Sequence, residues 1–201
     1  MAKIIENGKR VKYSSYEEYV KIQDSRYHDY DCPNCLKMNM KLIDIIRKMG
    51  INFKHILDIG CRDAAYFDKM KKQQIACTGV DISPRSVKYA ASKGRNVSIG
   101  DAVNLSSLFK EKFDLIISCH SFEHLLKPEK VLKECYKVLA KGGHLAIRMP
   151  NEGDKIRNTT TKAHARAYTE KDLRGIFGNT KFSILKLELI PSNEFIIILE
   201  K

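Results

Sequence analysis

The stretch Lys54-His-Ile-Leu-Asp-Ile-Gly-Cys-Arg-Asp-Ala-Ala65 decides the fold, because an apolar run rich in β-formers ends in an acid and a glycine just before a helical pattern. This pattern predicts a strand that enters a helix through a tight turn. In an open parallel sheet, such a junction faces the crevice where ligands bind. Gly60 lets the backbone approach a ligand, and the Asp58 carboxylate suits a cationic group but would repel a pyrophosphate. The expected ligand is therefore not a dinucleotide.

Composition limits the classes of protein that the chain can form. With 201 residues, 43% of them hydrophobic, it can bury one good core, so one globular domain is the default. No stretch approaches the roughly 18 consecutive apolar residues of a membrane span, and the start lacks the apolar region of a signal peptide. A cytoplasmic protein is expected. The formal charge of +12 favours acidic partners, nucleic acid among them, but the lysines are scattered as on an ordinary solvated surface.

The six cysteines mostly fall in expected strands, strand ends and helices, which favours reduced thiols over a disulfide framework. Only Cys32-Pro-Asn-Cys35 has the spacing of metal ligands. His28 would add a third ligand, whereas a closed zinc site needs four. We therefore expect no metal site here, and the simpler interpretation is a helix start that carries two thiols.

Residues 1–50 are expected to form a helical lead-in that packs on the core formed by residues 51–201. Ser14 and Glu17 have the spacing of a helix cap, and Pro33 begins a longer helix that Gly50 ends. In many enzymes of this layout, such leading helices fold over the ligand, which would bring Tyr27 and Tyr30 towards it.

After the first strand, helical patterns over 63–73, 84–93, 128–141 and 170–177 alternate with strand patterns over 75–80, 96–101, 113–118 and 144–149. Two last strands, 181–188 and 194–200, are joined by a turn too short for a crossover, so one of them is antiparallel. The predicted fold is a three-layer αβα sandwich around a Rossmann-like seven-stranded sheet, mostly parallel with an antiparallel C-terminal hairpin. The polar segment 150–167 is long for a loop, and such loops are usually functional.

A set of motifs follows the strand ends in order: Leu57-Asp-Ile-Gly-Cys61, Gly79-Val-Asp-Ile-Ser83, Gly100-Asp-Ala102, Phe113-Asp-Leu-Ile-Ile117 with Phe122-Glu-His-Leu125, and Tyr136-Lys-Val-Leu-Ala-Lys-Gly-Gly143. Together they resemble the class I S-adenosylmethionine-dependent methyltransferases. The likeness is to the broad type 11 subgroup with small-molecule, lipid-quinone and tRNA-modifying members, and it covers roughly residues 54–200.

The resemblance implies S-adenosylmethionine as cofactor. It places Asp58, Gly60 and Cys61 at the methionine end, Asp81 at the ribose hydroxyls, Ile82, Asp101 and Ala102 around the adenine, and the backbone of Ser118 and Cys119 near the sulfonium. An acid at the tip of a second parallel strand also suits a ribose on physical grounds. The chain departs from the family where Arg62 and Ala64 stand at positions in which glycines are common, which leaves the effect of Arg62 on cofactor binding open.

Methyl transfer from a sulfonium needs positioning first, and a base only when the acceptor must lose a proton. The candidate bases are His120, His124 and His164, and the resemblance places Arg166 over the acceptor pocket as a substrate ligand. The alternative is that Glu123 pairs with His124 to fix the loop, that His164 faces solvent, and that positioning alone carries the reaction.

The predicted function is transfer of a methyl group to an O or N atom of a small-molecule acceptor. One alternative is a methyltransferase for RNA, for which Tyr13, Tyr16 and Tyr19 would offer stacking beside basic residues. Another is a cofactor-binding protein that has lost catalysis. A nicotinamide dehydrogenase is excluded, since the turn after Gly60 lacks the second and third glycines that admit a pyrophosphate.

Overall fold

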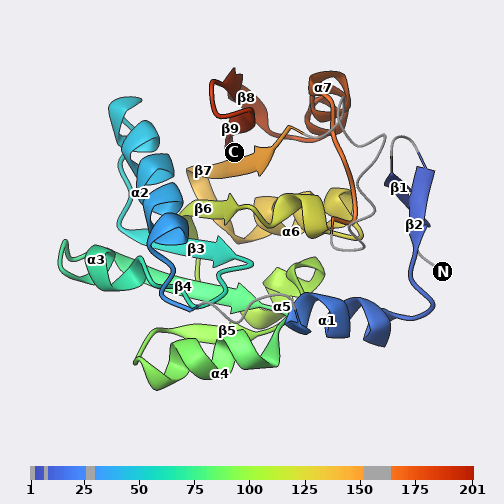
Figure 1. Ribbon diagram of the computed structural model, residues 1–201. Coiled ribbons are helices and arrows are strands. Elements are labelled where there is room, and N and C mark those ends of the chain that lie inside the picture. Colours follow the sequence, from blue (N-terminus) through green and yellow to red (C-terminus); the bar gives the residue numbers. More distant parts are fainter. Residues whose placement is uncertain (1–2, 7–8, 26–29, 152–163) are drawn as a thin grey trace.

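A computed structural model describes residues 3–6, 9–25, 30–151 and 164–201, and its centre is a seven-stranded sheet with helices on both faces (Figure 1). The strand order is β5-β4-β3-β6-β7-β9-β8. The strands are β3 (His55–Ile59), β4 (Ala76–Asp81), β5 (Val97–Ile99), β6 (Phe113–Cys119), β7 (Leu139–Pro150), β8 (Ser183–Ile190) and β9 (Glu194–Glu200). All neighbours from β5 to β7 pair in parallel, whereas β9 pairs antiparallel with both β7 and β8. The predicted fold class is confirmed.

The helices connect successive strands and carry the segments around the sheet. They are α1 (Tyr16–Ser25), α2 (Pro33–Lys48), α3 (Phe67–Lys71), α4 (Pro84–Ser92), α5 (Leu105–Leu108), α6 (Pro128–Val138) and α7 (Glu170–Gly178), with short 3-10 turns η1 (Ala102–Asn104) and η2 (Phe122–His124). Two of the helices are capped at their N-termini, since Ser83 accepts a hydrogen bond from Ser86 N and Thr169 forms a capping box with Asp172. Within the described residues, no helix is both long and apolar enough to cross a bilayer.

Two apolar cores sandwich the sheet because the central strands bury both of their faces. On one face, α2 inserts Leu42, Ile43 and Ile46 against Ile56 and its neighbours in the sheet. The other face packs against α5, α6 and α7 in a larger cluster. Helix α2 thus packs on the sheet, while the division into a lead-in over residues 1–50 and a core over residues 51–201 stays a prediction.

The order of the strands places a ligand crevice. From β3 the chain moves outward to β4 and β5, and it then returns to pair β6 on the other side of β3. The connections that follow β3 and β6 therefore run in opposite directions from the carboxyl ends of the strands, which is where open α/β sheets bind ligands.

Several element boundaries differ from those that the sequence predicts. The lead-in also contains a hairpin, β1 (Lys3–Glu6) with β2 (Lys9–Lys12), and Ser15 rather than Ser14 accepts the bond from the first helical turn. Helix α3 begins only at Phe67, because the preceding residues form a turn with left-handed backbone. Helix α6 ends at Val138, and β7 takes in Gly142 and Gly143 because Leu139 already pairs with Phe113. Residues 152–163 of the long polar segment lie outside the described residues.

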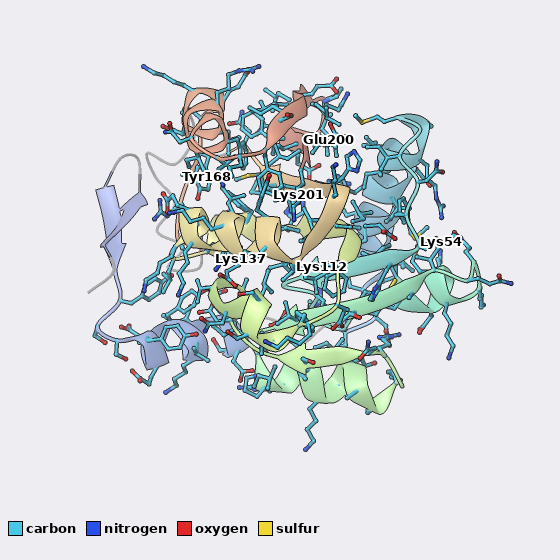
Figure 2. All side chains as sticks on the ribbon, turned by 180° about the vertical axis from the view of Figure 1, so that it is seen from behind. Lys54, Lys112, Lys137, Tyr168, Glu200 and Lys201 are labelled. Carbon is cyan, nitrogen blue, oxygen red and sulfur yellow. The ribbon has the colours of Figure 1, made fainter. Side chains whose placement is uncertain are left out.

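Part of the basic charge has a structural use at the edge of the sheet opposite the crevice (Figure 2). Lys112 Nζ donates to the Lys137 carbonyl at 2.8 Å, and Lys201 Nζ donates to the Leu139 carbonyl at 2.7 Å. Both ammonium groups thus meet the carbonyl end of α6, where the helix dipole favours positive charge.

A buried ion pair fastens the C-terminal hairpin to the sheet. Arg148 in β7 donates to Glu194 in β9 through Nη2 at 2.6 Å and through Nε at 3.1 Å. The guanidinium, with the Ser192 and His120 side chains, lowers the pKa of Glu194 to about 2. We expect Glu194→Ala to lower the free energy of unfolding by about 3–5 kcal/mol, because it leaves the Arg148 charge buried without its carboxylate.

Urea denaturation followed by circular dichroism measures this loss. The matched control is Glu188→Ala in β8, where the carboxylate is half exposed and pairs with Lys186, so a change within about 0.5 kcal/mol is expected. Equal effects of the two substitutions would contradict the structural role of Glu194.

Candidate functional site

The crevice at the carboxyl ends of β3, β4 and β6 is a cavity of about 270 Å³. Its wall is formed by the strand tips, by the loops that follow them, and by α1 and α2. All residues predicted to contact the cofactor line this wall except Ser118, namely Asp58, Gly60, Cys61, Asp81, Ile82, Asp101, Ala102 and Cys119. The structure thus brings together residues from four segments of the sequence.

Ser118 lies just behind the wall and supports it. Its hydroxyl hydrogen-bonds the Ser121 hydroxyl at 2.6 Å. Ser121 Oγ in turn donates to the Ile59 carbonyl at 2.6 Å. The β6 loop is therefore tied directly to the end of β3.

A glycine is required at position 60 because the loop after β3 and the loop after β6 cross in contact with each other at this point. Its backbone is left-handed, with a φ of +71°, and a Cβ at this position would lie 2.5 Å from Ser121 Cβ. The sequence predicts that Gly60 lets the backbone approach a ligand. The structure adds that the closest neighbour of this glycine is the β6 loop.

Arg62 and Ala64 keep the backbone shape of the glycines that are common in the family. Both have a φ of +52°, a region that costs a residue with a side chain roughly 1–2 kcal/mol. The Arg62 guanidinium is drawn towards α2, where Nη1 donates to Cys35 Sγ at 2.9 Å and the group lies 5.9 Å from the Tyr30 ring centre. Arg62 therefore forms one wall of the cavity and leaves its interior open.

The Cys35 sulfur is thus already engaged by Arg62. Cys32 and Cys35 are both thiols, while His28 lies outside the described residues. The expectation that Cys32 and Cys35 form no metal site stays a prediction.

The cavity is acidic although the whole chain is strongly basic. Among the described residues, four carboxylates line it, those of Asp58, Asp63, Asp81 and Asp101, and Arg62 supplies the single guanidinium or ammonium group of the wall. Such a wall attracts a cation and repels a phosphate.

Asp58 is the most perturbed of these carboxylates. Burial raises its pKa to about 8, with further upward contributions from the charges of Asp81 and Asp63, while the nearby Tyr66 hydroxyl acts in the opposite direction. A cation bound in the cavity would favour the ionised form of this group.

The other two strand-tip acids are fixed by backbone amides. Asp81 accepts hydrogen bonds from Arg62 N at 2.7 Å and from Ser83 N at 2.8 Å, and burial raises its pKa. Asp101 accepts one from Val103 N at 3.0 Å. These bonds set the direction in which each carboxylate faces the cavity.

Helix α1 covers the cavity and is bound to its rim at several points. Tyr16 donates its hydroxyl proton to Asp101 at 2.8 Å, and Tyr19 donates to the His124 carbonyl at 3.1 Å. At the end of the helix, Asp24 accepts from the Ser83 hydroxyl and from the Arg85 guanidinium. Helix α1 thus contributes to the cavity wall, while the expectation that the leading helices fold over a ligand stays a prediction. Tyr30 instead stacks on Tyr89, and Tyr27 lies outside the described residues.

Two of the predicted histidines line the cavity. His120 has a left-handed backbone, with a φ of +53°, and its Nε2 lies 2.6 Å from Glu194 Oε1. Burial lowers the pKa of His120, although the Glu194 carboxylate opposes this effect. His124 lies on the far side of the same loop, and its backbone is held by a bond to the Ser121 carbonyl.

His164 and Arg166 come from the segment that follows the long loop. The His164 ring packs edge-on against the His124 ring, with centroids 4.8 Å apart, so it lies beside the cavity rather than in solvent. The Arg166 guanidinium donates to the Leu126 carbonyl at 3.0 Å and faces Glu129. Arg166 does not line the cavity, and its role as a substrate ligand stays a prediction.

The sequence did not predict the site contacts of three residues, which are Ser121, Tyr16 and Glu194. Ser121 and Glu194 make their contacts across 62 and 74 residues of chain, and a lone Ser or Glu gives no periodic signal. The sequence indicates Tyr16 only as a residue that could stack on RNA, and that interpretation did not indicate its bond to Asp101.

Comparisons with known proteins agree with this geometry. Residues 57–147 match the family model described as a methyltransferase domain. The structure superposes on a SAM-dependent methyltransferase from Aquifex aeolicus with a TM-score of 0.67 and 17% identity, over 90% of this chain and 97% of the other. The likeness at this identity shows the fold, and together with the family match it confirms the predicted resemblance.

Two curated relatives share part of the sequence. A ubiquinone biosynthesis O-methyltransferase from Psychrobacter cryohalolentis is 24% identical over 116 residues, which are 54% of this chain and 45% of the relative. Ajmaline N-methyltransferase from Rauvolfia serpentina is 34% identical over 103 residues, 47% of this chain and 35% of the relative. The match thus spans less than half the length of these two relatives.

The crossing at Gly60 gives a test of the site's framework. We expect Gly60→Ala to lower the free energy of unfolding by roughly 2 kcal/mol or more, since it combines a left-handed backbone with a clash against Ser121. Gly175→Ala in α7 is the control, because nothing lies within 4 Å of its added Cβ. Urea denaturation compares the two. If the added Ser121→Gly change recovers none of the loss, the clash is not its cause.

The pKa of Asp58 predicts how stability depends on pH. Because the folded chain keeps this proton to about pH 8 while an unfolded aspartate loses it near 4, the free energy of unfolding should fall as pH rises between these values. The slope is up to about 1.4 kcal/mol per pH unit. Urea midpoints across this range should show a shallower slope for Asp58→Asn and an unchanged one for Asp44→Asn, an exposed aspartate of α2. Parallel curves for all three proteins would contradict the raised pKa.

Proposed function

The chain carries a class I S-adenosylmethionine-dependent methyltransferase domain, and from this premise we propose that it transfers a methyl group from S-adenosylmethionine to an O or N atom of a small-molecule acceptor. The observation that carries the proposal is the acidic cavity at the switch point of the sheet. Although the chain is strongly basic, the described residues of this cavity include four carboxylates and a single guanidinium, that of Arg62.

The residues of the cavity fit this cofactor. Its sulfonium and ammonium groups are cationic, which suits the buried carboxylate of Asp58, whose pKa is raised while no cation is bound. Its single ribose suits Asp81, which sits at a strand tip with its carboxylate fixed by two amides. It has no phosphate, and the part of the wall that the structure describes contains a single guanidinium and no lysine.

In this proposal Asp58, Gly60 and Cys61 hold the methionine end of the cofactor. Asp81 holds the ribose hydroxyls, Ile82, Asp101 and Ala102 surround the adenine, and Ser118 supports the loop at the sulfonium through Ser121 while Cys119 lines it. Helix α1 excludes water from this side through the Tyr16 and Tyr19 bonds.

S-adenosylmethionine supplies a methyl group activated by its sulfonium. The chain then has to position an acceptor and, where this is a hydroxyl or an ammonium group, take up a proton. His120 and His124 line the cavity beside Cys119, so we assign the proton-accepting role to this pair, with His164 next to His124. Glu194 acts as a positioning residue, because it holds His120 Nε2.

A small-molecule acceptor is favoured by the use that the chain makes of its N-terminal tyrosines. Tyr13 and Tyr19 are buried and pack edge to face, and the Tyr16 hydroxyl is bound to Asp101. The rings of Tyr13 and Tyr19 are therefore too buried to stack on RNA bases, and Tyr19 lines the cofactor cavity. The two curated relatives named above carry the names of an O- and an N-methyltransferase of small molecules.

We further propose a cytoplasmic setting. None of the six cysteines, all of which the structure describes, forms a disulfide, as expected of a protein in a reducing compartment.

Isothermal titration calorimetry with S-adenosylhomocysteine and S-adenosylmethionine tests the cofactor assignment. The wild-type chain should bind both with one site. Asp81→Asn should weaken binding by roughly 10- to 100-fold, because charge-assisted hydrogen bonds to the ribose are lost. Asp44→Asn should bind as the wild type does. No heat at high protein concentration would refute the assignment.

Labelled methyl transfer into a small-molecule extract tests the reaction itself. Label should appear in low-molecular-weight material and should resist ribonuclease. Cofactor binding without transfer to any fraction would favour the alternative of a catalytically inactive protein, and ribonuclease-sensitive label would favour an RNA acceptor.

A further inference from the structure

A second group of side chains lies beside the cavity, at the edge where the acceptor would enter. Glu123 and His124 come from η2, and His164 comes from the segment after the long loop. One ligand atom from each of the three lies within 4.8 Å of the other two. Glu123 and His124 are buried, and His164 is partly so.

Contacts around the cluster hold its two segments together. Arg166 N donates to the Glu123 carbonyl at 2.9 Å, and the Arg166 side chain donates to the Leu126 carbonyl. The Tyr168 ring packs on Phe122, with centroids 5.7 Å apart. His164 therefore reaches Glu123 and His124 from a segment that is bound to η2 by its backbone and side chains. This arrangement also gives Arg166 a structural use.

We propose that Glu123, His124 and His164 form a binding site for a divalent transition-metal ion. Two imidazoles and one carboxylate are a ligand set that suits ions such as Zn²⁺, Fe²⁺ and Co²⁺. Three protein ligands leave positions open for water or for a substrate atom. The present separations need to shorten somewhat for all three atoms to contact one ion, which small rotations of the His164 and His124 rings supply.

The position of the cluster gives the ion a role in the proposed reaction, and this part of the inference rests on the proposed function. His124 lines the cavity, and Glu123 Oε1 lies 3.8 Å from His120 Nδ1. An acceptor oxygen bound at an open position of the ion would lie on the side of the cavity where Cys119 and His120 are found. The acceptor class is thus an alcohol or phenol with an oxygen available for metal binding.

The balance of the transfer step follows from this placement. With the ion bound, His124 serves as a metal ligand, so the proton-accepting role falls to His120 alone. A metal ion lowers the pKa of a hydroxyl bound to it, and the acceptor releases its proton to His120. The acceptor oxygen then forms a bond to the methyl carbon while the carbon–sulfur bond breaks. The electron pair of that bond stays on sulfur, which leaves a neutral thioether.

Cobalt binding tests the site without reference to activity. The full chain is freed of metal with a chelator and titrated with Co²⁺, and its visible absorption and binding heat are followed. We expect one Co²⁺ per chain, and we expect His164→Gln and Glu123→Gln to weaken binding on the order of 100-fold, since each removes a ligand. The control is His144→Gln, whose histidine faces Glu200 in the sheet and should leave Co²⁺ binding unchanged.

Thermal unfolding of each variant separates loss of a ligand from loss of the fold. His164 is the informative position, because it is the least buried of the three and its replacement leaves the core in place. Absence of Co²⁺ binding by the wild type, or equal binding by the His164→Gln and His144→Gln variants, would overturn the metal site. It would leave a hydrogen-bonded cluster that only anchors the segment.

Binding of S-adenosylhomocysteine to the same samples keeps the two proposals apart. His164→Gln should bind this product with wild-type affinity, since His164 does not line the cavity. If the wild type binds Co²⁺ but no S-adenosylhomocysteine, the proposed function fails while the metal site stands. If it binds S-adenosylhomocysteine but no Co²⁺, the reverse holds.

Discussion

The hydrogen bond from Ser121 to the Ile59 carbonyl is the contact on which the rest of the site depends. It holds the loop after β6 against the end of β3, and it is possible only because Gly60 has no Cβ. The crossing sets where Asp58, Cys119 and His120 stand relative to one another. It also fixes the start of η2, and hence the Glu123, His124 and His164 group.

Charge is distributed in this molecule by function rather than evenly. A chain of net charge +12 places lysine ammonium groups on the carbonyl end of α6, at one edge of the sheet, and four carboxylates in the cavity at the other edge. Burial then raises the pKa of Asp58, and a bound cation would favour the ionised form of this carboxylate. Ligand charge and protonation are therefore coupled in the cavity.

The N-terminal segment belongs to the site as much as to the scaffold. Helix α2 completes one apolar core and offers Cys35 to Arg62, which keeps that side chain out of the cavity interior. Helix α1 closes the cavity through Tyr16 and Tyr19. The arginine that replaces a glycine in this turn is thus accommodated by its bond to Cys35 of α2. The backbone of Arg62 and Ala64 remains left-handed, which is unfavourable for residues with a side chain.

The sequence by itself determined the αβα sandwich, the presence of one antiparallel strand in the C-terminal hairpin and the acids at the strand tips, because periodic burial and strand-end chemistry are local properties of the chain. Only the tertiary structure decided that Ser121 meets Gly60, that Glu194 holds His120, and that His164 joins Glu123 and His124. Each of these contacts joins segments far apart in the sequence through one side chain, and a single side chain leaves no pattern from which its distant partner can be read.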